Sequence, residues 1–145
     1  MVEHVIEQDM IAHLIEKAIQ AREASYSPYS TYQVGAALLT EGGEIFTGCN
    51  IENAAYSPTN CAERTAFFKA VSEGKRKFSA IAIVGGTKNE EITQYAYPCG
   101  VCRQVMMEFC DPQTFQIIVA KSKNEYEIKT LLQLLPDGFG AANLS

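Results

Sequence analysis

The first apolar pattern in the chain has the spacing of a helix. Apolar positions recur every three or four residues, which predicts an amphipathic helix over residues 9 to about 24 with Asp9 as its N-cap. The polar segment 25–30 breaks this periodicity and ends the helix. The apolar positions on this face are Ile11, Leu14, Ile15, Ala18 and Ile19.

A β-hairpin is predicted next. Residues 32–40 form a nearly continuous apolar run, residues 44–49 form a second extended run, and the turn Glu41-Gly42-Gly43 separates them. The segments that follow are a polar loop over residues 50–60 and a helix over residues 61–73.

The second half of the chain alternates between strand and helix patterns. Strands joined through helices imply parallel pairing, whereas the opening hairpin implies antiparallel pairing, so the sequence predicts a mixed sheet with helices on both faces. The tail over residues 136–145 is predicted to be a loop. The predicted strands cover residues 78–85, 115–120 and 125–129, and the predicted helices cover residues 100–110 and 130–135.

Composition narrows the possible class of protein. A chain of 145 residues that is 47% hydrophobic can bury a core, and we expect residues 1–145 to form one domain. The formal net charge of -5 argues against a nucleic-acid partner, because such proteins normally present a basic face. The only dense basic run, Lys75-Arg76-Lys77, is typical of solvated surface.

The chain has the features expected of a cytoplasmic protein with reduced thiols. No stretch approaches the roughly 20 apolar residues that a membrane span needs. The segment MVEHVIEQDM lacks the basic and apolar regions of a signal peptide. The five cysteines are an odd number, which argues against a disulfide framework and favours metal binding or catalysis.

Three cysteines stand where helices are predicted to begin. Cys61 opens one helix, and the pair Cys99 and Cys102 occupies positions i and i+3 at the start of another. Thiolates at helix N-termini gain from the positive end of the helix, and three of them form an open zinc site with a fourth position for water. The pair alone also fits a redox disulfide, or half of a structural zinc site completed by Cys49 or Cys110.

Glu63 strengthens the catalytic interpretation. It lies two residues after Cys61, so its carboxylate can reach a water molecule on the metal without being a ligand. Glu63 also has a simpler interpretation, because Asn60 followed three positions later by Glu63 fits an N-terminal capping pair.

These motifs together resemble the zinc nucleoside deaminases, whose pattern is Cys or His-x-Glu followed by Pro-Cys-x-x-Cys. The similarity is closest to the small homotetrameric cytidine deaminases and covers nearly the whole chain. It implies an α/β fold, a three-layer αβα sandwich with a five-stranded mixed sheet. The motifs are Cys61-Ala62-Glu63 and Pro98-Cys99-Gly100-Val101-Cys102, with further likeness in segments 33–37, 48–56, 60–65, 103–105 and 134–136.

The resemblance also implies roles for individual residues. Asn50 and Glu52 would bind the ribose hydroxyls, Tyr32 would pack beside the base, and the backbone of Ala62 would orient the reacting groups. Two aromatic residues would lie near subunit contacts: Tyr56 close to the site, and Phe139 reaching the base of a neighbouring subunit. The expected assembly is therefore a homotetramer with shared active sites and one Zn²⁺ per subunit.

The reaction implied is hydrolytic deamination of cytidine and deoxycytidine to uridine and deoxyuridine, with Glu63 as the proton-transfer group. Asn50 and Glu52 favour a nucleoside over a blasticidin-type substrate. A deoxycytidylate or nucleic-acid substrate would call for a basic cluster near the motifs. A non-catalytic zinc or redox module is the alternative from another class.

Arg64 is expected to balance the negative charge of the three thiolates. A site with three cysteine ligands carries excess negative charge, which would raise the pKa of the water that the metal must activate. We expect Arg64 to donate hydrogen bonds to the sulfurs of Cys99 and Cys102, with Arg103 as the rival cation.

Overall fold

The fold was analysed in a computed structural model, which describes residues 6–144. Five strands and four α-helices alternate in the predicted order, followed by a short 3₁₀ helix. The elements are α1 (Gln8–Arg22), β1 (Tyr32–Thr40), β2 (Ile45–Cys49), α2 (Ala62–Ser72), β3 (Phe78–Thr87), α3 (Gly100–Phe109), β4 (Gln116–Ser122), β5 (Glu125–Thr130), α4 (Leu131–Leu134) and η1 (Ala141–Asn143).

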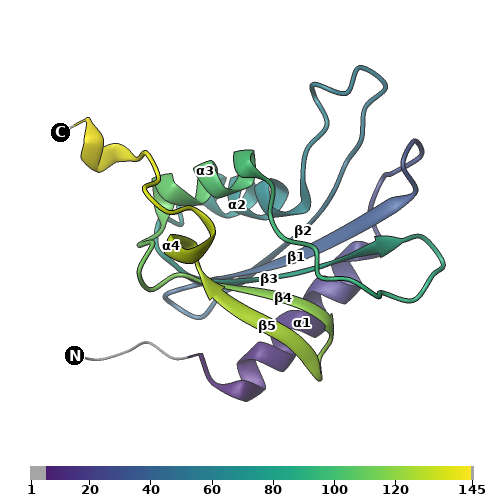
Figure 1. The fold of residues 1–145 in the computed structure, drawn as a ribbon, viewed down its shortest axis with the longest axis horizontal. Helices are drawn as coiled ribbons and strands as arrows, with labels where there is room; N and C mark the ends of the chain where they lie inside the picture. Colours follow the sequence, from purple (N-terminus) through teal and green to yellow (C-terminus); the bar gives the residue numbers. More distant parts are fainter. Residues whose placement is uncertain (1–5, 145) are drawn as a thin grey trace.

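The five strands form one mixed sheet in the order β2-β1-β3-β4-β5. The β3–β4 pair is parallel and the other three pairs are antiparallel. Helix α1 covers one face of the sheet, and α2 and α3 cover the other (Figure 1). The predicted three-layer αβα sandwich is therefore confirmed.

The side chains of the central strands point alternately to the two faces of the sheet, so the core has two halves, one on each face. On β1, Ala36 and Leu38 pack toward α2 and α3, whereas Ala37 and Leu39 pack toward α1. Successive side chains of a strand point to opposite faces, so a strand buried on both faces is apolar at every position. This explains why residues 32–40 show no polar alternation.

Two glycines bring the helices close to the sheet. A Cβ at Gly35 would lie 2.0 Å from the backbone oxygen of Ala18 on α1, and a Cβ at Gly48 would lie 2.4 Å from that of Ala62 on α2. Any side chain at these positions would push its helix outward. Gly48 therefore sets the height of the α2 N-terminus above the sheet.

Most element boundaries lie within two residues of the predicted ones, and three differences are informative. The N-cap of α1 is Glu7, and Asp9 lies in the first turn, so the predicted cap was wrong. Strand β3 continues to Thr87 because its last residues pair with the start of β1, a long-range contact that the local pattern does not contain. The tail contains η1, which is stabilised by a hydrogen bond from Gly140 N to Asn143 Oδ1 at 2.8 Å.

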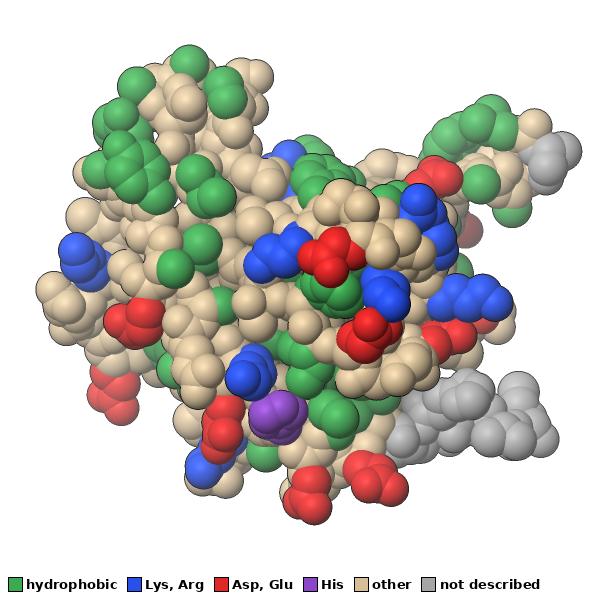
Figure 2. All heavy atoms as spheres, turned by 180° about the vertical axis from the view of Figure 1, so that it is seen from behind, with side chains coloured by type: hydrophobic (Ala, Val, Ile, Leu, Met, Phe, Trp, Pro, Cys, Tyr) green, Lys and Arg blue, Asp and Glu red, His purple; other side chains and the backbone are tan. Residues whose placement is uncertain are grey.

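Figure 2 shows acidic and basic side chains interspersed over the face seen from behind, with hydrophobic side chains gathered on the projecting loop that follows β2. No helix within residues 6–144 has the length and apolar character needed to cross a membrane.

Candidate active site

Three sulfur atoms meet at the N-termini of α2 and α3. Cys61 is the N-cap of α2, Cys99 is the N-cap of α3, and Cys102 lies in the first turn of α3. The three Sγ atoms lie within 4.8 Å of one another, and those of Cys61 and Cys99 are 3.8 Å apart. The positive ends of both helices therefore face the same group of sulfurs.

The three thiols differ in burial and in acidity. Cys102 is buried, Cys61 is half-buried and Cys99 is exposed. A hydrogen bond with Cys102 lowers the pKa of Cys61 to about 5, and the same interaction raises the pKa of Cys102. Among residues 6–144, the other two cysteines, Cys49 and Cys110, lie outside this group.

Glu63 is buried beside the sulfurs on the first turn of α2. Its side chain is only 4% exposed, and this burial raises its pKa to about 7. The capping alternative required Asn60 at the N-cap, but that position belongs to Cys61. The amide of Asn60 instead donates to Thr65 Oγ1 at 3.1 Å.

The position of Arg64 corrects one prediction. Its Nη2 donates to the Sγ of Cys61 at 3.3 Å rather than to Cys99, and its charge also acts on Cys102. The buried Nε of Arg64 has no hydrogen-bond partner among residues 6–144. The rival cation, Arg103, is bonded elsewhere, to the backbone oxygens of Pro98 at 2.7 Å and Leu134 at 2.6 Å.

This donor set fits a zinc ion. Thiolate sulfur is a preferred zinc ligand, and three protein ligands leave one coordination position open, as in catalytic sites. Glu63 lies close by but is not part of the group that could hold a metal, so its carboxylate is available for proton transfer. Arg64 offsets the negative charge of the sulfurs.

A cavity of about 260 Å³ opens beside the sulfurs and collects several of the residues expected to bind substrate. Tyr32, Asn50, Ala62 and Glu63 all line it. Tyr97 also lines it, and the sequence analysis missed this residue although it stands directly before the Pro98-Cys99 motif.

The amide of Asn50 joins the cavity wall to β1. Its Nδ2 donates to the backbone oxygen of Tyr32 at 2.8 Å, and its Oδ1 accepts from the backbone nitrogen of Val34 at 2.9 Å and from the hydroxyl of Ser25. The ring of Tyr32 lies over Gly85, where a Cβ would come within 3.1 Å of the Tyr32 ring and hydroxyl.

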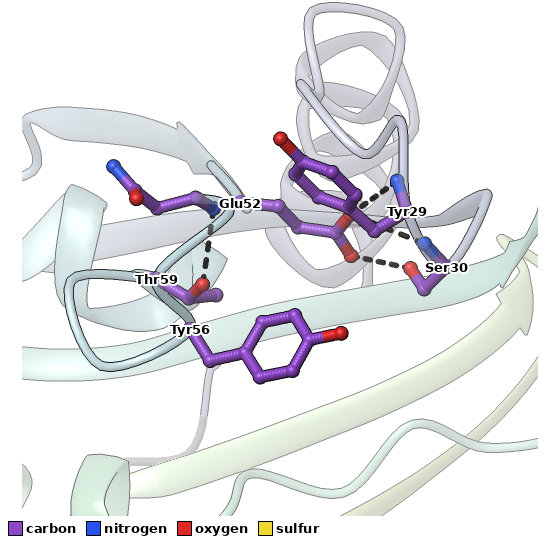
Figure 3. Close-up of a pocket in the computed structure, with 6 residues that line it drawn as sticks. Tyr29, Ser30, Glu52, Tyr56 and Thr59 are labelled. Atoms are coloured by element: carbon purple, nitrogen blue, oxygen red, sulfur yellow. Dashed lines mark hydrogen bonds between the residues drawn. The ribbon is translucent and has the colours of Figure 1, made fainter.

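Glu52 and Tyr56 line a second, larger hollow of about 400 Å³, which contains none of the sulfurs. The carboxylate of Glu52 accepts hydrogen bonds from the backbone nitrogen of Tyr29 and from the backbone and hydroxyl of Ser30 (Figure 3). The two hollows share Thr59, so they adjoin. The chemistry nevertheless points to the smaller one, because of the two hollows only it is lined by Cys61, Cys99 and Glu63.

Phe139 lines neither hollow of its own chain. Its side chain is 56% exposed on the C-terminal segment, which extends away from the sheet beyond α3 (Figure 1). Its backbone oxygen accepts a hydrogen bond from Gln104 Nε2 at 2.8 Å, which ties this segment to α3.

Comparison with known proteins agrees with this arrangement. Residues 9–118 match the family model described as the cytidine and deoxycytidylate deaminase zinc-binding region. The fold and the cysteine cluster thus define a zinc-dependent deaminase.

The chain belongs to the cytidine and deoxycytidylate deaminase family. A cytidine deaminase from Sporosarcina psychrophila is 50% identical over 135 residues, which cover 93% of this chain and 95% of that protein. The crystal structure of cytidine deaminase from Burkholderia pseudomallei matches with a TM-score of 0.79 and 46% identity, covering 88% of this chain and 97% of that one. The cytidine deaminase structure from Mycobacterium tuberculosis matches with a TM-score of 0.75 and 35% identity, covering 94% of this chain and 99% of that one.

Proposed function

We propose that this protein catalyses the hydrolytic deamination of cytidine and deoxycytidine to uridine and deoxyuridine, with release of ammonia. The observation that carries the proposal is the buried carboxylate of Glu63 beside three sulfurs that lie within 4.8 Å of one another. Cys61, Cys99 and Cys102 would hold one zinc ion per chain. A reaction of this kind serves pyrimidine salvage.

Glu63 moves the protons in this mechanism. When bound, zinc supplies a Lewis acid that makes a water molecule easier to deprotonate near neutral pH. Glu63 accepts a proton from the attacking water and delivers it to N3 of the pyrimidine, while the water oxygen forms its bond to C4. Glu63 then carries the second water proton to the exocyclic amine, so that the C4–N4 bond breaks and ammonia leaves. In the zinc-free chain, burial raises the pKa of Glu63 to about 7, which is the direction that suits a carboxyl group that both takes and gives protons near neutral pH.

Other residues orient the nucleoside. Tyr32 provides an aromatic face for the pyrimidine, and the backbone of Ala62 offers polar groups beside Glu63. Asn50 and Glu52 bind the ribose hydroxyls from the side where the two hollows adjoin. An amide and a carboxylate together offer both a donor and acceptors to such hydroxyls.

A nucleoside suits the site better than a nucleotide. None of the residues lining the two hollows, all of them in the described part of the chain, has a positively charged side chain. A phosphate group would also come close to the carboxylate of Glu52. Deoxycytidylate is therefore a weaker candidate substrate than the nucleosides, and a blasticidin-type substrate, the nearest alternative, would not use the ribose contacts.

The test is to incubate the purified protein, with its zinc content measured, with cytidine, deoxycytidine and deoxycytidylate. We expect loss of cytidine absorbance and stoichiometric ammonia with both nucleosides, and a much lower kcat/KM with deoxycytidylate. A zinc-loaded protein that releases no ammonia from either nucleoside would contradict the proposal.

The active assembly is a homotetramer with shared active sites. Two observations support this: Tyr56 and Phe139 are 74% and 56% exposed, and the C-terminal segment extends away from the sheet of its own chain (Figure 1). A mixture of an inactive Glu63→Ala protein and a protein truncated before Phe139 should regain activity through hybrid sites. Light scattering gives the mass of the assembly, and activity that stays absent after verified subunit exchange would contradict shared sites.

A reducing cytoplasm is the compartment that would keep the three thiols available for zinc.

A further inference from the structure

Tyr97 is an aromatic wall of the cavity whose role the motifs do not explain. It lines the same cavity as Glu63 and Cys99, and its side chain is 41% exposed. In the sequence only the buried Pro98 separates Tyr97 from Cys99, which carries one of the three sulfurs. A substrate that occupies the cavity shared by Tyr97, Cys99 and Glu63 therefore lies beside Tyr97.

The hydroxyl of Tyr97 is engaged outside the cavity. It donates a hydrogen bond to Oε1 of Glu127, a residue of the edge strand β5 that does not line the cavity. The rings of Tyr97 and Tyr95 pack edge to face with centroids 6.5 Å apart, and Nζ of Lys121 lies 4.7 Å from the centroid of the Tyr95 ring.

These contacts tie the segment leading to α3 to the hairpin of β4 and β5. In Figure 1 this segment returns from the end of β3 toward α3. A tyrosine side chain has two torsions, and a hydrogen bond at its far end fixes the ring in one orientation. The side chain of Tyr97 is thus held by Glu127 of β5. Strand β5 forms one edge of the sheet, and β2 forms the other.

We propose that Tyr97 is a specificity-determining residue, whose ring limits the space around C4 of the pyrimidine, and that Glu127 is a positioning residue that holds the ring in place. This inference rests on the proposed deaminase function. When C4 of the pyrimidine approaches the sulfurs, we expect the amine on C4 and the substituent on C5 to face Tyr97, so extra bulk at either position should meet its ring.

Substrate analogues test whether the Tyr97 ring limits the space around C4 of the pyrimidine. The kcat/KM ratio of cytidine to N4-methylcytidine and to 5-methylcytidine is measured for the unaltered protein and for Tyr97→Ser. We expect the smaller side chain to reduce discrimination against at least one analogue by about tenfold, since one methyl group in a fitted pocket is typically worth 10-fold or more. Unchanged ratios for both analogues would overturn the proposal.

A second variant and a check of the unaltered protein allow every result of this experiment to be interpreted. If Tyr97→Ser does not fold, Tyr97→Leu keeps an apolar but smaller side chain and gives the same measurement. If the unaltered protein does not deaminate cytidine at all, the proposed function fails, and that result is distinct from unchanged ratios in an active enzyme.

A double-mutant cycle tests the positioning role. Tyr97→Phe and Glu127→Ala should each raise KM for cytidine more than they lower kcat, and the double variant should resemble either single one, because both remove the same hydrogen bond. Glu127→Gln keeps an acceptor and should restore most of the loss. Lys129→Ala, two residues further along β5, is the matched control. A Glu127→Ala variant that behaves like this control, or additive effects in the double variant, would overturn the role of Glu127.

Discussion

The two adjoining hollows are built from different kinds of structure. The hollow with the sulfurs rests on the N-termini of α2 and α3 and on residues of β1 and β3, all packed against the main core. The larger hollow lies between two exposed loops and contains Glu52 and Tyr56. Helix termini anchored on a sheet hold groups precisely enough for proton transfer, whereas the loop-built hollow depends on a few hydrogen bonds.

The difference extends to how each hollow is completed. Every sulfur of the cluster and the catalytic candidate Glu63 come from one chain, so the fold of a single chain brings together the groups for metal binding and proton transfer. Tyr56, in contrast, lines the loop hollow but is 74% exposed and has a positive φ of 60°, so most of its side chain is uncovered within residues 6–144. We therefore expect substitutions in the sulfur cavity to act on turnover, and substitutions in the loop hollow to act on binding.

The largest expected effect is that of Glu63→Ala. Loss of one general acid–base group typically costs up to about 10⁴-fold, and Glu63 serves several transfers, so we expect a loss of kcat of at least that size. Zinc content and the circular dichroism spectrum should be unchanged, because the residue is not a ligand. A variant that retains a tenth of the activity would mean that Glu63 has only a structural role.

Much of this rigid region could be predicted from the sequence. The apolar runs predicted the strands. The predicted placement of Cys61 and Cys99 at the starts of helices was confirmed, since both residues are N-caps. The prediction for Arg64 was wrong for Cys99 but not for Cys102: the side chain interacts with Cys61 and Cys102, because the rotamer of a long side chain decides which neighbouring sulfurs it reaches. The sequence pattern did not indicate a role for Tyr97, because the position of its side chain depends on the contact between the segment before α3 and Glu127 of β5.

The second prediction uses the zinc-free protein and the pKa of Glu63. Burial raises this pKa from 4.5 to about 7, so between these values the folded state binds more protons than the unfolded state, and stability falls as the pH rises. Relative to Glu63→Gln, the free energy of unfolding of the unaltered chain should fall by about 3 kcal/mol between pH 4.5 and pH 8.

Urea unfolding at several pH values measures this difference. The comparison with Glu63→Gln is needed because Cys61, whose pKa is lowered to about 5, contributes the opposite slope in the zinc-free protein, gaining stability as the pH rises. Parallel curves for the two proteins would show that Glu63 does not titrate in this range.

Arg64→Gln should have the third largest effect. Arg64 donates to Cys61 and helps to lower the pKa of that thiol, so its removal should lower zinc retention or turnover by about 10–100-fold. Arg76→Gln is the control, because Arg76 is an exposed arginine far from the sulfurs, and it donates to the backbone oxygens of Val71, in the last turn of α2, and of Lys75. If both the zinc content, measured after dialysis against a chelator, and the turnover match this control, the charge-balancing role is contradicted.

The smallest expected effect belongs to the loop-built hollow. The Ser30 hydroxyl is the main group that holds the pKa of Glu52 below its ordinary value, with the backbone nitrogens of Ser30 and Tyr29 adding to it. In Ser30→Ala the pKa of Glu52 should therefore rise toward its ordinary range, which a carbon-detected NMR titration measures. Because Glu52 stays ionised at neutral pH in either case, kcat should not change and KM for cytidine should rise only a few-fold. Ser57→Ala, an exposed serine in the same loop as Glu52, is the control. A large fall in kcat would remove the distinction between the two hollows, since the loop would then hold a group needed for turnover itself.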